Sequence, residues 1–203
     1  AMMDNALLLR SATITCTGIA IRNASKGLDI RLSGTNVITS TDNVGLQADA
    51  NTTISAARAN ARMLITAATN GIYIANGTLT VRDGATLLAD ASQATPTPSL
   101  TNPTGCGICG RITTRTIGSN TITQYYGTLQ LQGMGTQLAT KGSLLSIGPL
   151  RDLKMTGFEF TSPSNARWNA QQNAVYDGTS PAKSLVTIEY NYKPGDVNED
   201  DIV

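Results

Sequence analysis

A short phrase that recurs along the chain constrains its fold more than any other feature. It reads Gly-Ile-Ala-Ile from Gly18, Gly-Leu-Gln-Ala from Gly45 and Gly-Ile-Tyr-Ile from Gly71, with a variant, Gly-Ile-Cys-Gly, from Gly107. The four glycines stand 27, 26 and 36 residues apart in the printed numbering. Repetition at a nearly constant spacing is typical of a solenoid, in which one supersecondary unit stacks on copies of itself.

Each repeat contains alternating apolar and polar residues, which predict strands with one buried face. A second strand is expected at 28–32 and 79–82, with 53–56 as a weaker counterpart, and a third at 37–39, 64–66 and 87–88. Charged residues make up only 14% of the chain, and Thr, Ser, Asn and Gly take their place. Thr suits strands and Asn and Gly suit corners, so three strands per repeat indicate the coils of a β-helix.

We therefore expect an all-β fold, a right-handed parallel β-helix (solenoid) of about five or six coils with a C-terminal β cap. The coils span 1–148, with a loop insertion near 95–105 because the segment 95–104 holds three prolines. After this loop, 121–123, 127–131 and 144–147 are expected to continue the coils. The cap is expected at 149–192, where the only Trp and both Phe residues lie.

The segment 193–203 is expected to be a linker and the start of a calcium-binding repeat. Asp196, Asn198 and Asp200 alternate after Pro194 and Gly195, and oxygen ligands in this pattern converge on one hard cation. The motif resembles the opening of a type I dockerin. Asp201 stands where the dockerin loop has glycine, and no carboxylate follows at position 12. We expect the calcium loop to be incomplete and unoccupied; the alternative is a solvated acidic tail.

Charge and composition argue against several classes of function. The net charge of +1 without a basic run argues against a nucleic-acid-binding protein. The chain has no histidine, the commonest general base and metal ligand. No run of about 18 apolar residues is present, so we expect no membrane span.

Arginine and tyrosine side chains are the candidates for ligand binding. Arg31 and Arg82 share an outward register and would suit an acidic glycan, with Arg58, Arg111 and Arg115 as candidates for the same stripe; a solvated face is the alternative. Tyrosine rings can stack on the apolar face of a sugar, and core packing is again the alternative. The tyrosine candidates are Tyr73, Tyr125 and Tyr126.

The cysteines do not indicate a metal or redox centre. Three cysteines without histidine cannot supply the four ligands of a structural zinc site. On an unbroken strand Cys106 and Cys109 would lie on opposite faces, so packing thiols are favoured over a redox pair. The chain also lacks the Asn-Thr-Asp and Gly-His-Gly signatures of polygalacturonase-like β-helix hydrolases, and its only Asp-Asp pair is at 200–201.

The repeats, together with the stretches 28–40 and 166–170, resemble secreted β-helix proteins of anaerobic bacteria, many of them known only as carbohydrate-binding-domain-like surface proteins. The resemblance implies a secreted or cell-surface, non-catalytic module of a larger protein that binds a glycan or acts as an adhesin, with a cohesin-like partner for the dockerin-like segment. The alternatives are a polysaccharide lyase or glycoside hydrolase, and a structural spacer. Two outward carboxylates about 5–9 Å apart would favour the enzyme, an aromatic platform beside the 95–104 loop would favour binding, and a featureless surface would favour the spacer.

Overall fold

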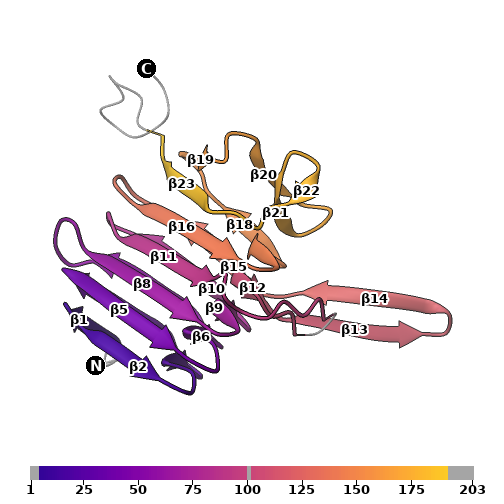
Figure 1. The fold of residues 1–203 in the computed structure, drawn as a ribbon, viewed down its shortest axis with the longest axis horizontal. Helices are drawn as coiled ribbons and strands as arrows, with labels where there is room; N and C mark the ends of the chain where they lie inside the picture. The colour runs from indigo at the N-terminus through magenta and orange to yellow at the C-terminus, as the bar shows by residue number, and fades with distance from the viewer. Residues whose placement is uncertain (1–4, 100–101, 192–203) are drawn as a thin grey trace.

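The computed structural model describes residues 5–99 and 102–191, and within these ranges the regular elements are strands without any helix. Three sheets run along the solenoid (Figure 1), and each receives one strand from each turn except the last, which adds a strand to the first sheet alone. The first sheet contains β1 (Ala6–Arg10), β4 (Leu28–Ser33), β7 (Thr52–Ala56), β10 (Thr78–Arg82), β15 (Thr128–Leu131) and β18 (Asp152–Lys154). The second contains β2 (Thr13–Cys16), β5 (Thr35–Ser40), β8 (Arg62–Ala67), β11 (Thr86–Ala91) and β16 (Gln137–Gly142). The third contains β3 (Ile21–Asn23), β6 (Leu46–Ala48), β9 (Asn70–Ile74), β12 (Cys106–Gly110) and β17 (Leu145–Ile147).

All pairings among these strands are parallel, which confirms the predicted β-solenoid with about six turns. Parallel register places equivalent side chains in columns along the axis. In the third sheet Leu46 pairs with Ile72, and Ile72 pairs with Ile108, and all three are buried. The column continues the apolar interior from turn to turn, so no single turn has a core of its own.

The predicted alignment of the four glycines is right for three of them and wrong for the first. The pairing of β6, β9 and β12 places Gly45, Gly71 and Gly107 in one column. In the first turn Ile21 pairs with Leu46, so Ala20 rather than Gly18 lies opposite Gly45. A Cβ atom at Gly18 would meet nothing within 4 Å. The first turn thus begins its third strand two residues later than the repeated phrase suggests.

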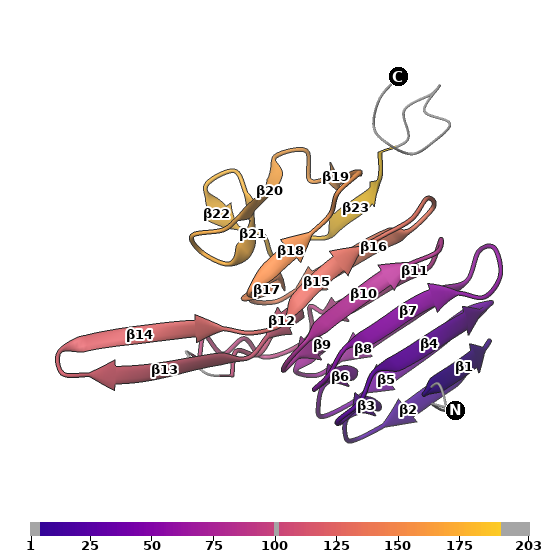
Figure 2. The ribbon, with the colours of Figure 1, turned by 180° about the vertical axis from the view of Figure 1, so that it is seen from behind.

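The prediction that 121–123 continues the coils is also wrong. These residues lie in β14 (Asn120–Tyr125), which pairs antiparallel with β13 (Ile112–Ile117) to form a two-stranded hairpin. This hairpin, which we call the arm, projects away from the solenoid (Figures 1 and 2). Hairpin strands and coil strands share the same period of two, so alternation alone could not separate them. The coils resume at β15 and β17, as predicted.

The segment 95–104 is a loop outside the coils, as its prolines predict. Its described residues contain one isolated bridge, between Thr97 and Thr104, and no strand. The buried side chain of Asn70 holds the end of the loop: its Nδ2 donates to the carbonyl oxygen of Pro103 at 2.9 Å, and its Oδ1 accepts from the backbone N–H of Cys106 at 2.9 Å. One amide therefore joins the loop to the third sheet.

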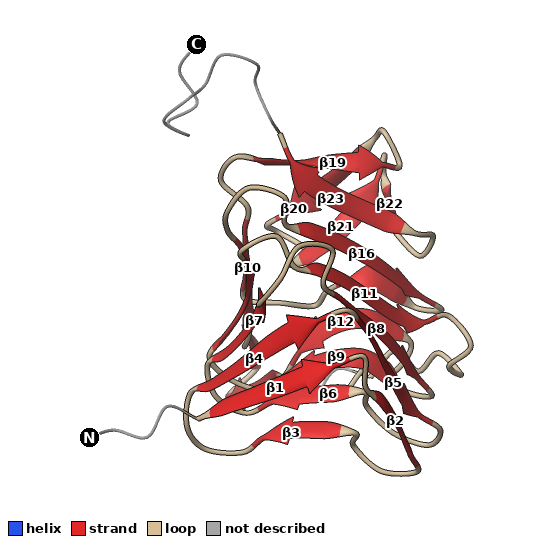
Figure 3. Cartoon of the chain, turned by 90° about the vertical axis from the view of Figure 1, so that its left-hand side faces the viewer, coloured by secondary structure: helices blue, strands red, loops and turns tan. Residues whose placement is uncertain are grey.

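The parallel coils end at β18, which still pairs with β15, so they extend a few residues into the range 149–192 predicted for the cap. After β18 the pairing changes to antiparallel. β23 (Val186–Tyr190) adds antiparallel to β16, and β19 (Phe158–Ser162) adds antiparallel to β23. A small separate sheet contains β20 (Ala166–Asn169), β21 (Ala174–Asp177) and β22 (Ser180–Pro181). Figure 3 shows these strands stacked over one end of the solenoid. The ring of Tyr190 meets that of Phe158 edge-on, with centroids 5.3 Å apart.

Candidate functional site

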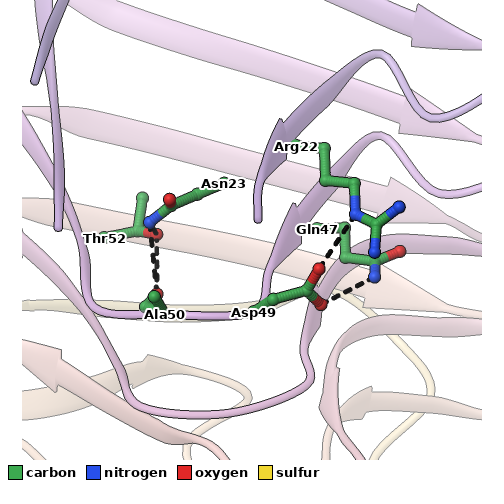
Figure 4. A network of polar contacts seen from close by, with 6 residues as sticks. All are labelled: Arg22, Asn23, Gln47, Asp49, Ala50 and Thr52. Atoms are coloured by element: carbon green, nitrogen blue, oxygen red, sulfur yellow. Dashed lines mark hydrogen bonds and ion pairs between the residues drawn. The ribbon is translucent and has the colours of Figure 1, made fainter. Parts of the chain in front are cut away.

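The outer face of the third sheet has a polar network at its N-terminal end (Figure 4). Asp49 accepts hydrogen bonds from Arg22 Nε at 2.9 Å and from Gln47 Nε2 at 2.7 Å. Beside it, Asn23 Nδ2 donates to Thr52 Oγ1 at 3.0 Å and to the carbonyl oxygen of Asn51 at the same distance. These contacts join the first turn to the second and satisfy the groups involved. The network therefore stabilises the stacking of the turns.

Farther along this sheet, Tyr73 and Tyr126 lie near Arg111. The guanidinium carbon of Arg111 lies 4.1 Å from the centroid of the Tyr126 ring, which is a cation–π contact. Burial raises the pKa of Tyr73 to about 12; the charges of Cys109 and Asp49 raise it further, and that of Arg111 lowers it. Arg111 Nε is buried and has no hydrogen-bond partner within the described residues. Tyr126 thus stacks on the Arg111 guanidinium, and the positive charge of Arg111 also acts on Tyr73.

Tyr125 lies on the opposite side of the arm. Successive residues of a strand face opposite ways, so Tyr125 and Tyr126 leave the base of the arm on different faces. Tyr125 pairs with Ile112, and both line a groove of about 490 Å³. Pro98 and Pro103 of the 95–104 loop form a second part of its lining. Tyr176 of β21 lies in the lining as well.

Four separate parts of the chain thus build this groove: the 95–104 loop, the arm, residues 144–149 and residues 172–183. Its volume falls in the range of small-molecule sites, roughly 300–1,000 Å³. Prolines, leucines and two tyrosines supply an apolar surface, and Ser99, Gln172 and Lys183 supply polar groups. Among the described residues that line it, none is Asp or Glu. Such a surface can bind an amphipathic ligand but offers no pair of carboxylates for acid–base chemistry.

Arg31 and Arg82 lie on a different sheet from these tyrosines. The register of β4, β7 and β10 places them in one outward column with Ser55 between them, as predicted. Arg31 Nε lies 2.7 Å from Asp29 Oδ2 and Arg82 Nε lies 3.3 Å from Asp83 Oδ2. Exposed ion pairs of this kind contribute about 0–1 kcal/mol.

The longer arginine stripe is wrong for two of its three further members. Arg58 follows β7, in the turn next to that of Arg31, and lines the same depression as Arg31. Arg111 lies between β12 and β13, and Arg115 is in the arm, so the insertion of the arm removes these two from the column. The structure therefore leaves Arg31 and Arg82 apart from the tyrosine candidates.

Both cysteines of the Cys-x-x-Cys sequence are buried and reduced. Burial raises the pKa of Cys109 well above its usual value, and a hydrogen bond with Cys106 and the charge of Cys106 raise it further. The two thiols thus influence each other electrostatically. β12 keeps one register with β9 from Cys106 to Gly110, so the strand that carries both cysteines is unbroken, as the prediction assumed. A raised pKa keeps Cys109 neutral and unreactive at neutral pH.

The predicted metal ligands Asp196, Asn198 and Asp200 lie outside the described residues. Within residues 5–99 and 102–191, no group of three or more Cys, Asp or Glu side chains could hold a metal ion. In the same part of the chain, no helix has the length and apolar character needed to cross a bilayer. Comparisons with protein-family models, curated proteins and solved structures find no match for this chain.

Tyr176 is the groove residue that sequence reasoning missed. It lies in the alternating stretch Val175-Tyr-Asp, which indicates a strand but not its neighbours. β21 reaches the 95–104 loop only because the chain folds back after residue 148. The one local signal that could mark it is a tyrosine between Val175 and Asp177 at the polar position of the alternation.

Proposed function

We propose that this protein is an extracellular, non-catalytic glycan-binding module of a larger bacterial protein, and that its ligand lies in the groove beside the arm. The observation that carries the proposal is the pair Tyr125 and Tyr176, which line one groove together with the 95–104 loop. A tyrosine presents an apolar ring and a polar hydroxyl, and a pyranose likewise has an apolar face and a rim of hydroxyls. Lys183 and Gln172 supply hydrogen-bond donors at the same groove.

The arm extends this surface. In the antiparallel register Thr114 pairs with Thr123 and Thr116 pairs with Thr121. By strand alternation these pairs lie on the same face of the arm as Ile112 and Tyr125, which line the groove. A chain of sugars that stacks on Tyr125 would therefore meet a row of threonine hydroxyls along the arm. This arrangement favours an extended glycan over a single monosaccharide.

The other hypotheses have weaker support. A glycoside hydrolase needs paired carboxylates at the ligand, and the described lining of the groove has none. A spacer needs no groove and no projecting arm. Adhesion to a surface glycan is the same binding event in another setting. Calcium at 195–203 and a cohesin-like partner for that segment remain predictions on residues outside those described.

A glycan array with the intact protein, followed by calorimetry on the hits, tests the proposal. We expect Tyr125→Ala and Tyr176→Ala each to raise the Kd about tenfold, which is about 1.4 kcal/mol. Tyr126→Ala is the matched control, because Tyr126 is adjacent in sequence but lies on the other face of the arm. Its Kd should stay within about twofold of the wild-type value.

Three outcomes would overturn the proposal. The array gives no hit, the Tyr125 and Tyr126 variants lose affinity equally, or the wild-type protein releases reducing ends from a bound glycan. The last outcome would favour the hydrolase or lyase. Thermal melts of each variant show whether a loss of affinity reflects unfolding instead.

A further inference from the structure

Three arginines line one shallow depression at the end of the first sheet. Arg10 is the last residue of β1, Arg31 lies in β4, and Arg58 follows β7, so they come from three successive turns. We call this depression the arginine pocket. Its volume is about 410 Å³, and Leu8, Ser33 and Ala57 complete its described lining.

The arginine pocket carries an excess of positive charge. Its described lining contains no Asp or Glu. Asp29, just outside it, accepts a hydrogen bond from Arg31 Nε at 2.7 Å and so orients that side chain. Within the described part of the chain, neither Arg10 nor Arg58 forms an ion pair. Three guanidinium groups beside one carboxylate leave two positive charges on this patch.

The register brings these side chains within reach of one small anion. Arg10 pairs with Ser33, and Arg31 pairs with Leu8, so Arg10 and Arg31 are diagonal neighbours on adjacent strands. Strands of a sheet lie about 4.8 Å apart, which puts the backbone at Arg10 and at Arg58 roughly 10 Å apart. Arginine side chains are long enough to converge on a group between them. The planar guanidinium binds carboxylate and sulfate groups through two parallel hydrogen bonds.

We propose that the arginine pocket binds the carboxylate or sulfate group of an acidic polysaccharide. The oxyanion chemistry rests on the pocket alone, and the choice of a polysaccharide as its carrier rests on the proposed function. The pocket lies on the first sheet, and the groove lies beside the arm and the third sheet. The protein would thus have two separate contacts with glycans, one apolar and one ionic.

Calorimetric titration of the intact protein with two probes tests the proposal at low salt. An oligogalacturonate supplies carboxylates and a heparin oligosaccharide supplies sulfates, so the two titrations identify the preferred group. Arg10→Ala and Arg58→Ala should each raise the Kd for that probe about fivefold, and the double variant about 25-fold. Arg167→Ala is the control, because it removes the same charge from an exposed residue of β20. All variants change exposed side chains, and their melting temperatures should match the wild type.

The proposal is overturned if neither probe binds, if the double variant binds both probes as the wild type does, or if Arg167→Ala loses as much affinity as Arg10→Ala. A DNA duplex that binds as tightly and depends on the same arginines would overturn the assignment to a polysaccharide. Titration with a neutral glycan from the array keeps the two proposals apart. That affinity should respond to Tyr125→Ala and not to Arg10→Ala.

Discussion

The glycine column of the third sheet makes a prediction that depends directly on the register. Replacing Gly71 by Ala adds a methyl group 2.6 Å from the carbonyl oxygen of Gly107 and 3.1 Å from Ala89 Cβ. Ordinary contact begins at 3.4 Å, so the backbone of the next turn must move by about 0.8 Å. Gly71 has no positive φ, so the substitution introduces no strain in its own backbone.

Two opposing effects determine how Gly71→Ala changes the free energy of unfolding. Overpacking against backbone atoms destabilises a protein by roughly 1–3 kcal/mol. The change from Gly to Ala also lowers the conformational entropy of the unfolded chain, which raises the free energy of unfolding by about 0.4–1 kcal/mol. We therefore expect the free energy of unfolding to fall by about 1 kcal/mol. For a chain of this size this corresponds to a melting temperature lowered by roughly 2–4 °C.

Gly18→Ala is the matched control, since the repeated phrase gives both glycines the same sequence context. A Cβ at Gly18 meets nothing within 4 Å, so only the effect on the unfolded chain remains and stability should rise slightly. Urea unfolding followed by circular dichroism measures both variants, and the slope of the transition should not change. Equal losses for Gly18→Ala and Gly71→Ala, or no loss for Gly71→Ala, would refute the register and the column built on it.

Three further predictions address other parts of the molecule. The pKa of Tyr73 is about 12 in the fold, against a usual value of 10.0. The contribution of this tyrosine to stability is therefore complete below pH 10 and is lost as the pH rises toward 12. A titration followed by absorbance at 295 nm should show one tyrosine that ionises late, and Tyr73→Phe should remove it. Asn70→Ala leaves the Pro103 carbonyl and the Cys106 N–H without their partner, so urea unfolding should show a loss of about 1–3 kcal/mol, and unchanged stability would contradict the role of the amide. Replacing 113–124 by a two-residue turn should shift the melting temperature by less than about 4 °C, because most of these side chains are exposed; a larger shift in calorimetry would mean that the arm supports the coils.

The sequence predicts the coils well because stacking enforces repetition. Leu28 and Leu79 are predicted to share a register, and the pairing of β4, β7 and β10 confirms it. Each such residue faces its equivalent in the next turn, so the same side-chain type recurs at the same place. The error at Gly18 occurs in the first turn, whose strands are outermost in all three sheets and which therefore meets a neighbouring turn on one side only.

The candidate site is less predictable for the same physical reason. Tyr125 comes from an insertion, and Tyr176 comes from the segment after the last regular turns. Neither has an equivalent in neighbouring turns, so no periodicity constrains its place. Residue type alone marks Tyr125 as a candidate, and no sequence pattern marks Tyr176 as its partner. Contacts between two segments that do not repeat depend on long-range packing, and the periodicity of the sequence carries no information about such packing.

The positions of the insertions explain why a groove forms where it does. The regular coils present nearly flat sheets, and a flat surface offers a ligand contact on one side only. The 95–104 loop leaves the fourth turn just before β12, and the arm leaves the same turn just after it. Two walls therefore flank one strand of the third sheet, and β21 with β22 adds a third wall over the end of the solenoid. Two insertions in one turn, together with the segment after the last coil, thus add a groove to a repetitive scaffold. Tyr125 and Tyr176 lie on these added segments rather than on the coils.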